Sequence, residues 1–484
     1  MPLEDIRAER VKKLDALRAM RIDPYPAETR RSFPIGTLMA EFAAHEAEAG
    51  EVFLAGRLMA LREHGGATFG DMRDESGTIQ VLFKKDIVGD TYDALVAALD
   101  IGDIIEVSGK PLTTQRGEKT IQVEKARMLT KSLRPLPEKW HGLVDVEERL
   151  RRRYLGLLMD PDERELFRKK SQFWQAIRSH MLSQGFLEVE TPVLESTPGG
   201  ADAEPFFTHL NALDIDLYLR ISLELPLKRL IVGGYEKVFE IGRIFRNEGI
   251  VREHLQDYTQ LEFYWAYADY RALMPFVGSL YRSVIKETLG NLSHSWNGET
   301  IDWSPTWPEI DYYDVFKKET GLDLTAVSDD ALQTYAGSEG IDVSHHIGRG
   351  WLIDAIFKKK VRPTFIQPAF LVLPPVEVEP LAKRWREDVR RVERFQVVAC
   401  ASELGKGFSE LNDPLDQRAR FEEQEKLRKA GDTEAQRLDE DFVEALEYGM
   451  PPTAGFGVSE RLFSVIMDKP VRETVFFPLM RPRQ

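Results

Sequence analysis

The stretch from Val238 to Tyr270, VFEIGRIFRNEGIVREHLQDYTQLEFYWAYADY, constrains the fold more than any other part of the chain. Its pattern predicts two strands, Val238–Glu248 and Tyr258–Tyr267, joined by a charged loop. Side chains alternate between the two faces of a strand. One face of the second strand therefore carries Thr259, Leu261, Phe263 and Trp265, and the other carries Tyr258, Gln260, Glu262 and Tyr264. We expect the first of these faces to be buried in a core.

The polar face of this hairpin has two interpretations. Solvent exposure is the ordinary one for a hairpin. Here, however, the connection has no Asn-Gly or Asp-Gly turn, and the strands are rich in Phe, Tyr, Trp and Ile. Polar groups set among aromatic side chains are typical of a ligand pocket. We therefore expect Arg246, Glu248, Glu262 and Tyr264 to line the floor of a pocket.

Length and composition limit the classes of protein that the chain can belong to. Its 484 residues are enough for about three domains, and the net charge is −15. An acidic total argues against non-specific coating of nucleic acid, although local basic patches can still bind it. Cys400 is the only cysteine, which excludes an internal disulfide and a cysteine-based zinc site. With neither a membrane-spanning run nor a secretory signal in the sequence, the expected compartment is the cytoplasm.

Residues 51–130 predict a small β-barrel. Short alternating runs such as VFLAGRLMAL, GTIQVLF and KTIQVEKARML are separated by turn signals, which is typical of an OB-fold. Phe69 lies in an otherwise polar segment of this region. It is either a core residue of the barrel or an exposed ring on which a nucleotide base stacks.

The segments FRNEGI and YTQLEFYWAY resemble motif 2 of the class II aminoacyl-tRNA synthetases, in the form found in bacterial-type lysyl-tRNA synthetases. The helix expected at Asp162–Gln184, with FLEVETPVLE after it, resembles motif 1, and TAGFGVSER resembles motif 3. The chain has neither a P-loop nor a GxGxxG fingerprint. The resemblance covers essentially the whole chain and implies an α+β fold, in which an antiparallel class II sheet flanked by helices follows an all-β OB-fold barrel.

The resemblance also implies a domain organisation. A helical segment would occupy residues 1–48, the anticodon-binding barrel 49–135, a linker 136–160 and the catalytic domain 161–484, with a helical insertion at about 271–360.

A two-step reaction is implied by the same resemblance. Lysine is activated by ATP, with release of pyrophosphate, and the lysyl group is then transferred to the 3′ end of tRNA(Lys). Such transfers depend on positioning and charge stabilisation more than on an acid–base pair. The expected partners are L-lysine, ATP, Mg²⁺, tRNA(Lys) and a second copy of the chain that docks through motif 1, with no membrane.

The family's functional positions fall on the following residues of this sequence. The catalytic residues are Arg246 and Arg461. The ATP contacts are Arg246, Glu248, His254, Tyr258, Glu403 and Arg461. The lysine contacts are Gly200, Glu224, Arg246, Glu262, Tyr264, Lys406, Phe408 and Glu410. The metal ligand is Glu403, with Gln396 at the second metal position, and the anticodon contacts are Phe69, Gln80 and Arg57.

The pair of Glu262 and Glu410 favours a cationic substrate, because a buried carboxylate pair without a cation is costly. Structural salt bridges to arginine are the alternative explanation. The same pair argues against aspartate as the substrate.

Four positions depart from the family pattern. Gln396 replaces a common metal-binding carboxylate, Lys406 and Leu255 each replace a common Asn, and Ser459 lies near an expected Gly in a motif 3 that is one residue shorter. Gln396 leaves the number of Mg²⁺ ions open. Lys406 either binds the substrate carboxylate or repels the substrate ammonium. Two other functions follow from these departures: a catalytically silent tRNA-binding or regulatory paralogue, and a related class II synthetase with altered amino acid specificity.

Overall fold

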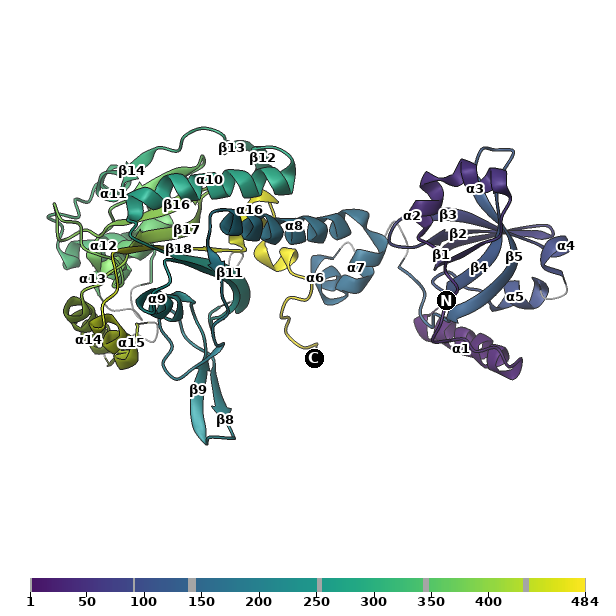
Figure 1. Ribbon diagram of the computed structural model, residues 1–484, viewed down its shortest axis with the longest axis horizontal. Coiled ribbons are helices and arrows are strands. Elements are labelled where there is room, and N and C mark those ends of the chain that lie inside the picture. The colour runs from purple at the N-terminus through teal and green to yellow at the C-terminus, as the bar shows by residue number, and fades with distance from the viewer. Residues whose placement is uncertain are drawn as a thin grey trace. The chain divides into compact units, whose positions relative to one another are not determined.

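The computed structural model describes residues 2–89, 92–137, 145–249, 255–342, 348–429 and 435–483. The chain divides into two compact units, residues 1–149 and 150–484, each with its own core (Figure 1). The division falls within the stretch that the sequence analysis assigned to a linker.

The first unit is built around a closed five-stranded barrel with the strand order β1-β2-β3-β5-β4. The strands are β1 (Val52–His64), β2 (Ala67–Arg73), β3 (Thr78–Lys84), β4 (Ile104–Thr113) and β5 (Lys119–Thr130). The helices are α1 (Leu3–Ala19), α2 (Ile35–Ala40), α3 (Phe42–Glu48), α4 (Lys85–Val88) and α5 (Tyr92–Ala98). These strands match the alternating runs of the sequence and confirm the predicted barrel, because alternation sends every second side chain inward.

An eight-stranded sheet organises the second unit, in the order β14-β15-β16-β17-β18-β11-β10-β6. The strands are β14 (Glu309–Asp311), β15 (Ala369–Val372), β16 (Arg394–Ala399), β17 (Ser402–Ser409), β18 (Thr453–Ser459), β11 (Asp257–Ala266), β10 (Lys237–Phe245) and β6 (Leu187–Glu188). The five interior pairings from β15 to β10 are antiparallel, and the two end pairings are parallel. This sheet confirms the predicted antiparallel class II architecture.

Helices cover both faces of this sheet. On one face, α8 (Pro161–Ser183), α10 (Tyr270–Leu289) and α16 (Arg461–Ile466) share a core with Leu261, Phe263 and Phe456 (Figure 1). On the other, α9 (Glu224–Val232), α14 (Pro414–Lys429) and α15 (Glu440–Glu447) share a core with Tyr264 and Phe408. The apolar face of the hairpin is therefore buried, as predicted.

Smaller elements complete the second unit. They are α6 (Val146–Arg151), which crosses the boundary between the units, α7 (Arg153–Met159), β7 (Leu194–Glu195), β8 (Phe207–Leu210), β9 (Ile215–Leu219), β12 (Ser293–Trp296), β13 (Glu299–Asp302), α11 (Tyr312–Thr320), α12 (Asp329–Ser338) and α13 (Arg349–Ile356). The range 271–360, predicted as a helical insertion, includes most of α10, which packs on the sheet, and the edge strand β14.

The central hairpin differs from the prediction at one end. Strand β10 ends at Phe245 rather than at Glu248, so Arg246 lies just beyond the strand. The polar face is also not exposed to solvent, since Glu262 and Tyr264 are each only 3% exposed. No helix in the described parts of the chain is long and apolar enough to cross a membrane.

Candidate active site

Two rows of residues cross the sheet on the side covered by α9. The first row runs from β16 to β10 through Gln396, Lys406, Gly457, Glu262 and Glu240. The second row, two residues away on each strand, runs through Arg394, Phe408, Gly455, Tyr264 and Val238. Residues directly opposite each other in antiparallel strands project to the same face. The predicted substrate residues of β11 and β17 therefore face the same space, on either side of the glycines of β18.

This arrangement requires a residue without a side chain at position 455, which is a glycine. A Cβ atom at Gly455 would lie 2.3 Å from Oε1 of Glu410 and 2.4 Å from Cε1 of Tyr264. Both of these side chains occupy the volume that a larger residue on β18 would fill. The glycine thus allows the carboxylate of Glu410, just after β17, and the phenol of Tyr264 on β11 to meet over the centre of the sheet.

Glu262 is held by four neutral donors. Its Oε1 accepts hydrogen bonds from the Ser222 hydroxyl (2.8 Å), the Leu223 amide (3.0 Å) and the Gln260 side chain (2.6 Å), and its Oε2 accepts one from the Tyr264 hydroxyl (3.1 Å). In the described part of the chain, no cation lies within ion-pair distance of Glu262. Hydrogen bonds fix the orientation of the carboxylate, but its charge is left for a ligand to neutralise.

The second acidic group already has a counter-ion. The Lys228 ammonium lies between Glu224, whose Oε1 is 2.5 Å away, and the carboxylate of Glu410, and all three residues are at most 4% exposed. Burial raises the pKa of Glu224 to about 7. Burial acts to lower the pKa of Lys228, but the two carboxylates outweigh it and the pKa is raised.

The ion pair between Lys228 and Glu410 contradicts one expectation from the sequence. We expected Glu262 and Glu410 to have no cation other than the substrate, and for Glu410 this is wrong because Lys228 contacts it. One ammonium nevertheless serves two carboxylates, and Oε1 of Glu410 is buried with no hydrogen-bond partner among the described residues. With Glu262 included, three carboxyl groups thus stand beside one buried ammonium, and the cluster has acceptors to spare.

Arg246 lies at the edge of this cluster. Its Nε donates to the Ile221 carbonyl (3.3 Å), and its guanidinium lies over the ring of Tyr258 at 5.7 Å from the centroid. Among the described residues, its two terminal nitrogens have no hydrogen-bond partner. A guanidinium with a free fork is suited to bind a carboxylate or a phosphate. Glu248 is half-buried two residues further on, and its carbonyl accepts a hydrogen bond from the Gln256 side chain (3.0 Å).

A third group forms around Glu403 on β17. The carbonyl of Glu403 accepts a hydrogen bond from Arg461 (3.1 Å), and its Oε2 accepts one from Nε2 of Gln396 (2.8 Å). Its Oε1 is buried and has no hydrogen-bond partner in the described ranges, although Arg362 lies 3.9 Å away. Arg461 is thus brought to the group that the sequence analysis assigned to ATP.

The contacts around Glu403 show which of its neighbours could bind the predicted Mg²⁺. Gln396 accepts a hydrogen bond from Arg394 through its Oε1 (2.9 Å), and because Arg394 can only donate, the amide nitrogen must face Glu403. On the side that faces Glu403, Gln396 therefore has no oxygen that could bind a metal ion. Its predicted role as a metal ligand does not fit this geometry. The described residues contain no cluster of three or more His, Cys, Asp or Glu side chains suited to a metal. One unpartnered carboxylate oxygen still fits Mg²⁺, which often uses one protein carboxylate together with substrate phosphates.

The remaining predicted substrate residues border the same space. Gly200, at a φ of +84°, packs so closely on Ser222 and Glu224 that a Cβ would lie 2.9 Å from Cβ of Glu224. The centroid of the Phe408 ring lies 5.5 Å from Nζ of Lys228 and 5.9 Å from Nζ of Lys406. His254 lies outside the described residues.

The predicted anticodon residues lie on the outer side of the barrel. On β2, the buried residues are Thr68, Gly70 and Met72, so alternation turns the half-buried Phe69 outward, and Phe69 does not belong to the barrel core. Gln80 lies opposite Asp71 on the neighbouring strand, and Arg57 donates to the Gly102 carbonyl (2.7 Å).

Sequence reasoning missed two residues of the site, Lys228 and Glu379. The spacing of Lys228, four residues after Glu224 on a helix, was a usable signal because such residues are neighbours on the helix surface. Glu379 contacts Lys406 from a segment 27 residues away, and no periodicity in the sequence marks it.

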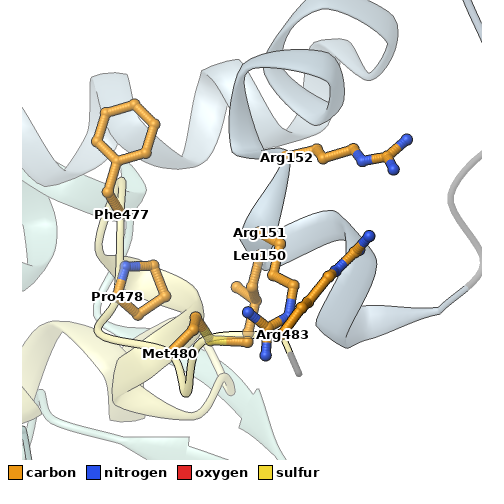
Figure 2. Close-up of a pocket in the computed structure, with 7 residues that line it drawn as sticks. All are labelled: Leu150, Arg151, Arg152, Phe477, Pro478, Met480 and Arg483. Carbon is orange, nitrogen blue, oxygen red and sulfur yellow. The ribbon is translucent and has the colours of Figure 1, made fainter.

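Two surface cavities lie outside these groups. One, of about 400 Å³, is lined by Leu150, Arg151, Arg152, Phe477, Pro478, Met480 and Arg483. Figure 2 shows that these residues come from two segments, the end of α6 with Arg152 after it, and the C-terminal stretch. The other, of about 460 Å³, lies between α8, the start of β11 and the C-terminal stretch. Neither cavity is lined by a predicted catalytic or lysine-binding residue.

Comparison with known proteins identifies the two units separately. Residues 145–481 match the family model of tRNA synthetases class II (D, K and N), and residues 52–129 match that of the OB-fold nucleic acid binding domain. The chain is 46% identical to the lysine–tRNA ligase of Moorella thermoacetica, over 99% of this chain and 98% of the relative. It is 44% identical to that of Bacillus subtilis, over 99% and 98%, and 44% identical to that of a Roseiflexus species, over the full length of both. With these matches and the geometry above, the chain belongs to the lysine–tRNA ligase family of class II tRNA synthetases.

Proposed function

We propose that this protein activates L-lysine with ATP and transfers the lysyl group to the 3′ end of tRNA(Lys). The observation that carries the proposal is the surplus of buried carboxyl groups over ammonium groups above the glycines of β18. Glu224 and Glu410 share the buried ammonium of Lys228, Glu262 has only neutral partners, and one carboxylate oxygen of Glu410 has no partner among the described residues. A substrate with two amino groups supplies the missing cations.

The first step follows from the positions of the side chains. Glu262, Tyr264 and Glu410 bind the side-chain ammonium of lysine, and Glu224 binds the α-amino group. The free fork of Arg246 holds the lysine carboxylate against the α-phosphate of ATP, which favours attack at phosphorus. The bond between the α-phosphorus and the bridging oxygen breaks, and pyrophosphate leaves. Tyr258 offers a ring face to the adenine, and Arg461 is placed to neutralise phosphate charge.

In the second step, a ribose hydroxyl at the 3′ end of the tRNA attacks the lysyl carbonyl carbon. The new ester bond forms as the bond to AMP breaks, so AMP is the leaving group. The half-buried ring of Phe69 on the outer side of the barrel is suited to stacking with an anticodon base. We further propose that the protein is a homodimer, with the surface around motif 1 as the interface.

Glu403 is the residue that would hold Mg²⁺ through its unpartnered Oε1. When bound, the ion supplies charge neutralisation to the phosphates of ATP. Gln396 supplies no charge, so Glu403 is the one described residue whose carboxylate we assign to this position.

The test is pyrophosphate exchange into ATP, measured without tRNA against each of the twenty amino acids. We expect exchange with lysine only. Exchange with a different amino acid would support a synthetase of altered specificity, and no exchange with any would support the silent tRNA-binding paralogue. The variant Phe69→Ala adds a control for the barrel. It should leave exchange unchanged and raise the KM for tRNA in aminoacylation, because the first step needs no tRNA.

A further inference from the structure

A lysine of the protein itself stands beside the proposed lysine pocket. Lys406 and Glu262 lie in the same row of the sheet, on the two strands that flank Gly457. Two interstrand spacings separate their backbones by about 10 Å, a distance that a lysine stem and a glutamate stem can span together. Gly457 has no side chain to stand between them. The ammonium of Lys406 is therefore within reach of a carboxylate that we assign to the substrate.

In the structure, the ammonium of Lys406 contacts Glu379 and not Glu262. Its Nζ lies 2.7 Å from Oε2 of Glu379, whose side chain is 3% exposed and also lies 3.5 Å from Arg394. Burial acts to raise the pKa of Glu379, but Lys406 and Arg394 outweigh it and lower the pKa. Glu379 is thus an ionised, buried anchor for a side chain that is itself 44% exposed.

Without the carboxylate of Glu379, we expect the ammonium of Lys406 to bind Glu262. Glu224 and Glu410 already share Lys228, whereas the partners of Glu262 are neutral. An unanchored ammonium next to a buried carboxylate without a counter-ion gains a strong charge-assisted contact. It would occupy the position of the substrate ammonium.

We infer that Glu379 is a positioning residue that determines lysine affinity, by holding Lys406 away from Glu262 and so keeping the pocket open. The inference rests on the proposed function, because it takes Glu262 as a substrate ligand. Glu379 acts through Lys406 and does not touch the substrate.

A double-mutant cycle tests this inference. Glu379→Gln keeps the shape of the side chain and removes its charge, and Lys406→Met removes the competing ammonium while keeping most of its length. Glu423→Gln, which removes an exposed carboxylate paired with Lys426 on α14, is the matched control. For each variant, the KM for lysine, the KM for ATP and kcat are measured by pyrophosphate exchange, together with the melting temperature.

We expect Glu379→Gln to raise the KM for lysine about tenfold, which corresponds to Lys406 closing the pocket in about nine-tenths of the molecules. The KM for ATP should stay close to the wild-type value. The double variant Glu379→Gln/Lys406→Met should regain the lysine KM of Lys406→Met alone. If the double variant keeps the whole defect of Glu379→Gln, then Glu379 acts through the local packing and the inference is wrong.

A crystal structure of Glu379→Gln separates this inference from the proposed function, because it needs no substrate. Nζ of Lys406 within hydrogen-bond distance of Glu262 supports the inference, whichever amino acid the wild type activates. Lys406 in any other place overturns it, even if the wild type activates lysine.

Discussion

Replacing Gly455 with alanine tests the geometry of the pocket directly. The added Cβ would lie 2.3 Å from Oε1 of Glu410 and 2.4 Å from Cε1 of Tyr264, whereas carbon atoms in ordinary contact are about 3.5–4.0 Å apart. At least one of these side chains must move by about 1 Å, and both are buried, at 1% and 3% exposure, so neither can move into solvent.

The size of the effect follows from this overlap. Overpacking of a close-packed interior costs about 1–3 kcal/mol, and each 1.4 kcal/mol is tenfold in affinity. We therefore expect Gly455→Ala to raise the KM for lysine about 10- to 100-fold in pyrophosphate exchange. The KM for ATP should change much less, because Arg461 and Tyr258 lie outside the overlap.

Gly337→Ala is the matched control, because a Cβ at Gly337 on α12 meets no atom within 4 Å. It should leave both KM values unchanged and slightly raise the melting temperature, since alanine is the better helix former. A Gly455→Ala variant that kept the wild-type KM for lysine and the wild-type melting temperature would refute the placement of Glu410 and Tyr264 over Gly455.

Three further predictions concern single side chains. Glu410→Gln should raise the KM for lysine about 100-fold, because an oxygen that can accept from the substrate ammonium is replaced by an amide NH₂ group that can only donate, and an unchanged KM would remove Glu410 from the pocket. Burial raises the pKa of Glu195 to about 8, so the folded state binds the extra proton and its stability falls as the pH rises from about 4.5 to 8. Glu195→Gln should therefore lessen this fall by up to about 4 kcal/mol, measured as the free energy of unfolding in denaturant titrations at pH 5 and 8.5. An equal loss of unfolding free energy in both proteins between these pH values would contradict it. Cys400 is fully buried, and burial raises its pKa to about 12, so iodoacetamide should label it only after unfolding, as read by mass spectrometry; rapid labelling of the native protein would contradict its burial.

The sequence by itself determined the local features of this protein. Alternation located the barrel strands and separated the Leu261 and Phe263 face of the hairpin from the Glu262 and Tyr264 face, because the period of a strand depends only on backbone geometry. The aromatic content of the hairpin indicated that its polar face was not a solvent-exposed one, and the low exposure of both polar residues agrees.

Only the tertiary structure decided which charges meet. The contact of Lys228 with Glu410 joins residues 182 positions apart, and the anchoring of Lys406 by Glu379 comes from a segment without periodicity. The orientation of the Gln396 amide could not be predicted from the sequence either, because it depends on Arg394 donating to it on the same face of the sheet. Periodicity assigns a side chain to a face, but the electrostatics of a pocket depend on which distant segments pack over that face, and no local pattern encodes this.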